Sequence, residues 1–170
     1  MRLFSVIIIC ACIISACTTP ETLSEADPAE TVEESAVPQW FSNDVYSHSD
    51  SVAVYGFAMA SAADSAHAAT YSKESSVQNL KFEIDRLAED ARRELAAVSE
   101  SPYSDTAFII NLRTVIRDLS LEGADFTVKH EVSESGIHYI YSKAVVSREN
   151  IITLLQHNLH DEALLQKLAP

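Results

Sequence analysis

Glycine is scarce in this chain, and its first part contains almost no basic residues. The 170 residues include three glycines, three cysteines and one tryptophan. So few glycines exclude a glycine-rich loop that cradles phosphate, and no serine lies in a Gly-x-Ser-x-Gly sequence. Residues 3–72 hold nine acidic side chains and no lysine or arginine, and the formal net charge of the chain is −13. Because nucleic-acid binding requires basic side chains that neutralise phosphates, we expect no nucleic-acid partner.

The first sixteen residues have the three parts of a secretory signal peptide. Arg2 supplies a positive start, residues 3–16 are an apolar run, and small side chains precede Cys17. A transmembrane helix needs about 20 residues, so this shorter run is poorly suited to spanning a bilayer. We therefore interpret residues 1–16 as a signal peptide that is removed on export.

The four residues Ile14-Ser15-Ala16-Cys17 resemble the bacterial lipobox. The resemblance implies diacylation of the Cys17 thiol, cleavage before it, and acylation of the new amine. Several acyl chains make a durable anchor, since each buried CH₂ contributes about 0.8 kcal/mol and one chain binds only reversibly. By resemblance to Gram-negative lipoproteins, in which Asp after the cysteine marks the inner membrane, Thr18 at this position implies the outer membrane. The alternatives are a cleaved signal with a free Cys17 and an uncleaved N-terminal anchor.

The other two cysteines, Cys10 and Cys12, lie inside the predicted leader. Cys17 is then the only cysteine of the mature chain, which excludes a disulfide, a cysteine zinc site and a thiol nucleophile downstream. Residues 18–38 contain six acids, three prolines and no aromatic residue. This composition predicts a disordered, extended tether between the lipidated cysteine and a single domain at 39–170.

Hydrophobic periodicity predicts an α+β fold for that domain. Strands are expected at 52–58, 126–132 and 137–146, since these segments are rich in β-branched and aromatic residues or alternate apolar with polar. A capping signal at 61–64 opens a long helix at about 62–98, with a possible break at 70–72. A second helix is expected to be capped by Asp105 and to end at Gly123, and a last helix covers 150–168. The order β-α-α-β-β-α predicts a small antiparallel sheet packed against the long helix.

Several short motifs together resemble a known family. They are Pro38-x-Trp40, the run Tyr55-Gly56-Phe57-Ala58, the alanines Ala62, Ala66 and Ala69, and the hairpin segments 129–132 and 139–145. The chain is similar in these features to the twenty-kilodalton outer-membrane lipoprotein family, which includes a secreted surface antigen and lipoproteins needed for flagellar assembly. The resemblance implies a structural role in the envelope and brings no catalytic residues.

Side chains that carry chemistry form only weak patterns. Two histidine pairs stand out: His157 and His160, expected to be adjacent on the last helix, and His130 and His138, which flank the hairpin turn. Both pairs are interpreted as solvated polar residues, with metal binding as the alternative. Trp40 and Phe41 are expected to plug the core rather than to anchor a partner. Acidic and basic residues interleave along residues 81–94, which predicts a solvated face with ion pairs.

Two functions remain open from the sequence. The first is a non-enzymatic outer-membrane lipoprotein with a structural or interaction role, such as a flagellar or envelope-assembly accessory. Its partner, a protein or a second copy of the chain, is expected to bind through the long helix at about 62–98. The alternative is a periplasmic lipoprotein that binds a small ligand or a metal through its histidines and a cleft between the sheet and a helix. No catalytic residue and no cofactor is predicted.

Overall fold

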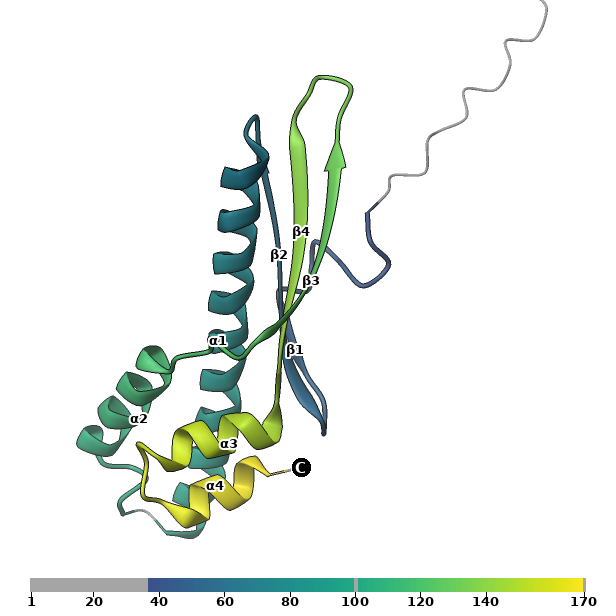
Figure 1. The fold of residues 1–170 in the computed structure, drawn as a ribbon. Coiled ribbons are helices and arrows are strands. Elements are labelled where there is room, and N and C mark those ends of the chain that lie inside the picture. The colour runs from purple at the N-terminus through teal and green to yellow at the C-terminus, as the bar shows by residue number, and fades with distance from the viewer. Residues whose placement is uncertain (1–36, 100, 170) are drawn as a thin grey trace, which may run out of the picture. The chain divides into compact units, whose positions relative to one another are not determined.

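A computed structural model describes residues 37–99 and 101–169. The predicted signal peptide, Cys17 and nearly all of the tether lie outside these residues. The described elements are β1 (Ser47–Ser49), β2 (Ala53–Ala62), α1 (Ser65–Val98), α2 (Thr106–Asp118), β3 (Asp125–Val132), β4 (His138–Ser147), α3 (Arg148–Gln156) and α4 (Glu162–Leu168) (Figure 1). The α+β prediction is confirmed, with β1 as a short strand that the sequence did not reveal.

The strands form one antiparallel sheet in the order β1-β2-β4-β3. The register places Gly56 of β2 opposite Ala144 of β4, and it places Val128 of β3 opposite Ser142. Because side chains alternate between the two faces of a sheet, Gly56, Ala144 and Ser142 point to the same side. That side is covered by α1, which crosses β2 and β4 (Figure 1).

Small residues line the contact between α1 and the sheet. Ser72 and Ser76 of α1 are fully buried against strands whose facing positions include Gly56 and Ala58. Helix α1 is continuous over 34 residues, so the open alternative of a break at 70–72 is excluded. It begins at Asp64, whose carboxylate accepts a hydrogen bond from the backbone amide of His67 at 2.9 Å. The capping prediction is thereby confirmed for Asp64. It is wrong for Ser61, which lies in β2, and the helix starts at Ser65 and not at 62.

The core continues from the sheet into a helical end of the molecule, where α2, α3 and α4 gather around the C-terminal half of α1 (Figure 1). The buried side chains there include Leu112, Ile116, Leu155, Leu159, Leu164, Leu165 and Leu168. Each of these three helices contributes a face of leucine or isoleucine side chains, as amphipathic helices of globular domains do. This helical end positions the cleft described below.

Two sequence expectations about helix ends are wrong. The last helix is divided into α3 and α4, because the Asp161 carboxylate accepts from the Leu164 amide at 3.0 Å and starts a new helix. Leu159 is buried in the connection, so the apolar periodicity continues across the break. Helix α2 ends at Asp118, five residues before Gly123, which lies in the turn leading to β3.

Candidate functional site

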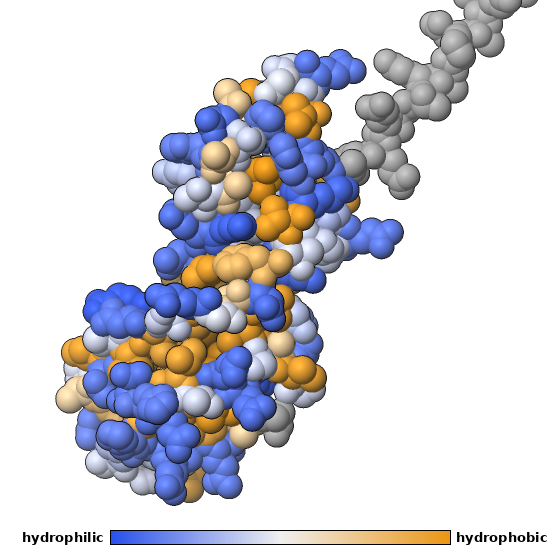
Figure 2. Space-filling model, in the orientation of Figure 1, coloured by the Kyte–Doolittle hydropathy of each residue, from blue (hydrophilic) through white to orange (hydrophobic). Residues whose placement is uncertain are grey.

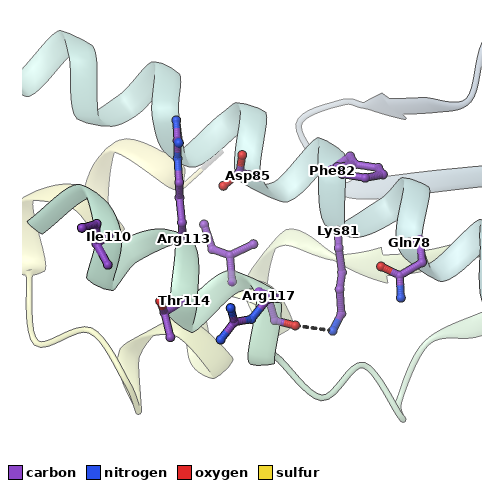
Figure 3. A pocket seen from close by; sticks show the side chains of 9 residues that line it. Gln78, Lys81, Phe82, Asp85, Ile110, Arg113, Thr114 and Arg117 are labelled. Carbon is purple, nitrogen blue, oxygen red and sulfur yellow. Dashed lines mark hydrogen bonds between the residues drawn. The ribbon is translucent and has the colours of Figure 1, made fainter. Parts of the chain in front are cut away.

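A cleft of about 400 Å³ lies between α1 and α2. Its walls come from both helices, and Figure 3 shows the side chains directed around the opening. The lining residues are Gln78, Lys81, Phe82, Asp85, Ile110, Arg113, Thr114, Ile116 and Arg117. Clefts of this size are typical of sites that accept a ligand or a protruding side chain of a partner.

The cleft has an apolar floor and two exposed apolar lips. Ile116 is 2% exposed and belongs to the main core, whereas Phe82 is 68% exposed and Ile110 is 60% exposed. Figure 2 shows apolar surface among charged residues over the helical end of the molecule. Large apolar side chains held in water at the rim of a cleft are typical of an interaction surface.

Within the described part of the chain, two of the charged groups of the cleft have no hydrogen-bond or ion-pair partner. The Lys81 ammonium donates to the carbonyl of Arg117 at 2.8 Å, the dashed line in Figure 3. The Arg117 guanidinium pairs with Asp118 at 2.8 Å. By contrast, Asp85 on α1 and Arg113 on α2 form no hydrogen bond or ion pair with any described residue. The cleft therefore offers one carboxylate and one guanidinium for an outside partner.

The two helices present their lining residues with the same spacing. Gln78, Lys81, Phe82 and Asp85 occupy positions i, i+3, i+4 and i+7 of α1. Ile110, Arg113, Thr114 and Arg117 repeat that spacing on α2. Residues with this spacing share one face of a helix, so each helix directs a complete stripe into the cleft. The only signal for this site in the sequence is weak: Phe82 and Ile110 are large apolar residues outside the core-facing stripes of their helices.

Two ion pairs within α1 also form hydrogen bonds to neighbouring segments of the chain. Glu83 is 4% exposed, and its carboxylate accepts from the Arg86 guanidinium at 2.6 Å and from the Ser49 hydroxyl at 2.6 Å. A further bond from Ser47 at 3.2 Å ties the edge strand β1 to the helix. The Arg86 hydrogen bonds lower the pKa of Glu83 to about 2; burial opposes this shift, and the Ser49 and Ser47 hydroxyls add to it.

The second ion pair holds the loop that follows α1. Arg92 is buried; its guanidinium pairs with Glu89 at 2.8 Å and also donates to the carbonyl of Tyr103. Hydrogen bonding from Arg92, followed by that from Arg93, lowers the pKa of Glu89 to about 2, although burial opposes the shift. The prediction of a solvated charged face is therefore wrong for Glu83 and Arg92, which are buried structural groups.

The histidine pairs differ in their placement. His157 and His160 lie in the connection between α3 and α4, so the prediction that they are adjacent on one helix is wrong. His130 and His138 meet across the β3–β4 hairpin, with 2.7 Å between Nε2 of the first and Nδ1 of the second. Within residues 37–99 and 101–169, no group of three or more His, Cys, Asp or Glu side chains is arranged to hold a metal ion.

Trp40 and Phe41 lie on the sheet face opposite α1. The Trp40 ring stacks on Phe57 of β2, with 6.4 Å between the ring centroids. Phe41 packs edge-on against Tyr141 of β4 at 5.0 Å, and the Lys143 ammonium lies 5.5 Å from the Trp40 ring. Both aromatic side chains are half-buried and cover part of a face that no helix covers among the described elements. The preceding Pro38 is buried, so the folded unit begins before residue 39.

Comparison with other proteins adds no relative. No family model, curated protein or solved structure matches the chain. The similarity to the twenty-kilodalton outer-membrane lipoprotein family therefore stays a prediction from the motifs. None of the helices in the described part of the chain has the length and apolar character required to cross a membrane.

Proposed function

We propose that this protein is an outer-membrane lipoprotein, anchored through Cys17, with a non-catalytic structural role in the cell envelope. The sequence Ile14-Ser15-Ala16-Cys17 carries this proposal, since it combines a short apolar leader with small residues and a cysteine at the cleavage point. Assembly of an envelope structure such as the flagellum is the role that the family resemblance suggests.

The anchor is tested by labelling with radioactive palmitate in a Gram-negative host. The unaltered protein is expected to incorporate the label and to fractionate with the outer membrane, and Cys17→Ser is expected to lose both properties. Cys10→Ser is the matched control, because Cys10 lies inside the predicted leader and leaves with it. The proposal would be contradicted if the Cys17→Ser protein incorporated as much label as the unaltered protein. It would also be contradicted if the Cys10→Ser control lost the label.

We further propose that the domain associates with a second copy of itself through the cleft between α1 and α2. A two-fold interface requires a surface that is complementary to itself. This surface carries both a protruding side chain, Phe82, and a cavity of about 400 Å³. It also carries Asp85 and Arg113, opposite charges without a partner among the described residues. A two-fold axis allows Asp85 of each copy to pair with Arg113 of the other.

Sedimentation of residues 17–170 with Cys17→Ser tests this association. The unaltered cleft is expected to give a concentration-dependent dimer, and Phe82→Glu is expected to give a monomer of unchanged circular dichroism. Tyr71→Glu is the control, because Tyr71 is an exposed aromatic residue on the same helix outside the cleft. In a charge exchange, Asp85→Arg or Arg113→Asp alone should weaken the dimer, and the two changes together should restore it.

The same cleft supports a second candidate function, a lipoprotein that binds a small ligand. Its volume of about 400 Å³ and apolar floor fall within the range of small-molecule sites. A chain that stays monomeric at all concentrations would contradict the dimer. A melting temperature raised by a small amphiphile, and no longer raised after Phe82→Glu, would support ligand binding in its place.

A further inference from the structure

We propose that His130 and His138 form a binding site for a divalent transition-metal ion of the Zn²⁺, Ni²⁺ or Cu²⁺ class. The site lies at the β3–β4 hairpin, and it depends neither on the lipid anchor nor on the cleft between α1 and α2. Imidazole nitrogens are preferred ligands of these three ions. The fold brings one ring nitrogen of each side chain within 2.7 Å of the other.

The register of the hairpin accounts for this convergence. His130 lies opposite Ile140, and His138 lies opposite Val132, so the two histidines are diagonal neighbours on one face of the sheet. Their ring centroids are 4.9 Å apart, and the rings are tilted by 30°. The backbone of two paired strands thus fixes the positions from which both rings project.

The contact between the rings directs two nitrogens at one point. Nε2 of His130 and Nδ1 of His138 are 2.7 Å apart, which is the distance of a shared hydrogen bond. One ring donates its N–H and the other accepts with its lone pair. When a metal ion takes the place of this hydrogen bond, the ring that donated carries its proton on its other nitrogen instead. Both facing nitrogens then act as ligands, each imidazole stays neutral, and no net proton is released. Bonds of about 2.0–2.1 Å require the nitrogens to separate by well under 1 Å from their present distance.

The surroundings of the pair suit an open site. The β2–α1 connection lies at the same end of the molecule as the hairpin (Figure 1). Its Asp64 is close enough to His138 for an electrostatic interaction between the two groups. His130 is exposed, so an ion and its water ligands have access from solvent. Two imidazoles would thus hold the ion, with water in the remaining positions and the Asp64 charge nearby.

Titration with zinc chloride, followed by calorimetry, tests the site. The protein is residues 17–170 with Cys17→Ser, which retains the whole described unit and contains no thiol that binds zinc. One zinc ion per chain is expected. His130→Asn and His138→Asn should each weaken binding by more than about tenfold, because each removes one ligand. The double variant with His157→Asn and His160→Asn is the matched control and should bind zinc as the starting protein does.

A second measurement identifies the ligands directly. Cu²⁺ bound to the same protein should give an electron paramagnetic resonance spectrum with coupling to two nitrogens, and each single variant should leave one. Nuclear magnetic resonance of the unaltered protein should show zinc shifting the imidazole signals of His130 and His138 ahead of all others. Absence of zinc binding would overturn the proposal. Binding that survives both variants, or that is lost in the control, would overturn it equally.

Discussion

Gly56 of β2 lies directly beneath Ser76 of α1. A Cβ atom placed on Gly56 would be 2.0 Å from the Ser76 carbonyl oxygen and 2.5 Å from the Leu80 amide nitrogen. Both contacts are with helix backbone, which cannot rotate away as a side chain can. The absence of a side chain at position 56 therefore sets the distance between the long helix and the sheet.

Gly56→Ala is expected to be among the most destabilising single changes in the protein. Overpacking of a well-packed core costs about 1–3 kcal/mol, and two contacts with the backbone of α1 place this change at or above the top of that range. Gly123→Ala is the control, since a Cβ there has no atom within 4 Å. Urea unfolding of both variants checks the prediction, which fails if the two lose the same free energy of unfolding.

The sequence predicted the long helix and the hairpin but not the closeness of their packing. Alternating and helical periodicities identify which residues face inward, and they placed β2, β3, β4 and α1 within a few residues. The three-residue strand β1 was not predicted, because Ser47 and Ser49 are held by the Glu83 carboxylate and not by apolar burial. No local pattern encodes a contact that joins residues more than thirty positions apart.

Glu83 is expected to make the free energy of unfolding depend on pH. Its pKa is lowered from 4.5 to about 2 in the folded protein, chiefly by hydrogen bonding from Arg86. A lowered folded-state pKa contributes stability that is present above the unfolded value of 4.5 and is lost as the pH falls toward 2. At one pKa unit per about 1.4 kcal/mol, the contribution at neutral pH is about 3–4 kcal/mol.

Urea unfolding of Glu83→Gln at several pH values measures this contribution. The variant should be less stable than the starting protein at pH 7, and the difference should shrink steadily below pH 4.5. Glu74→Gln, an exposed position on the same helix with no hydrogen bond or ion pair to another described residue, should show no such trend. A difference that stays constant from pH 7 to pH 2 would show that packing, not charge, explains the loss.

Arg92 and Arg93 are neighbours that bind the same carboxylate and should differ sharply in importance. Arg92 is buried and links Glu89 to the Tyr103 carbonyl, whereas the Arg93 side chain is 69% exposed and, among the described residues, pairs with Glu89 alone. Removal of one member of a buried pair typically costs about 3–5 kcal/mol, and an exposed pair contributes at most about 1 kcal/mol. Thermal unfolding of Arg92→Met and Arg93→Met should therefore give a large and a small loss, and equal losses would refute the assignment.

The cleft shows why the candidate site was harder to predict than the fold. Phe82 and Ile110 lie outside the core-facing stripes of their helices, and a single exposed apolar residue is ordinary on a protein surface. Only the packing of α2 beside α1 brings the two together around a cavity. The charges of Asp85 and Arg113 are equally uninformative until the structure shows that neither has a partner among the described residues.

Asp161 is expected to explain why the C-terminal segment forms two helices. Its carboxylate accepts from the Leu164 amide at 3.0 Å and from the Tyr103 hydroxyl at 3.3 Å. Loss of such a cap costs about 1 kcal/mol, so Asp161→Ala should lower the melting temperature by a few degrees. Asp105 precedes α2 in the same position but makes no capping bond, and Asp105→Ala should change stability by less than about 0.5 kcal/mol. Amide hydrogen exchange should also quicken at Leu164 in the first variant alone; if α4 stays as protected as before, Asp161 is not its cap.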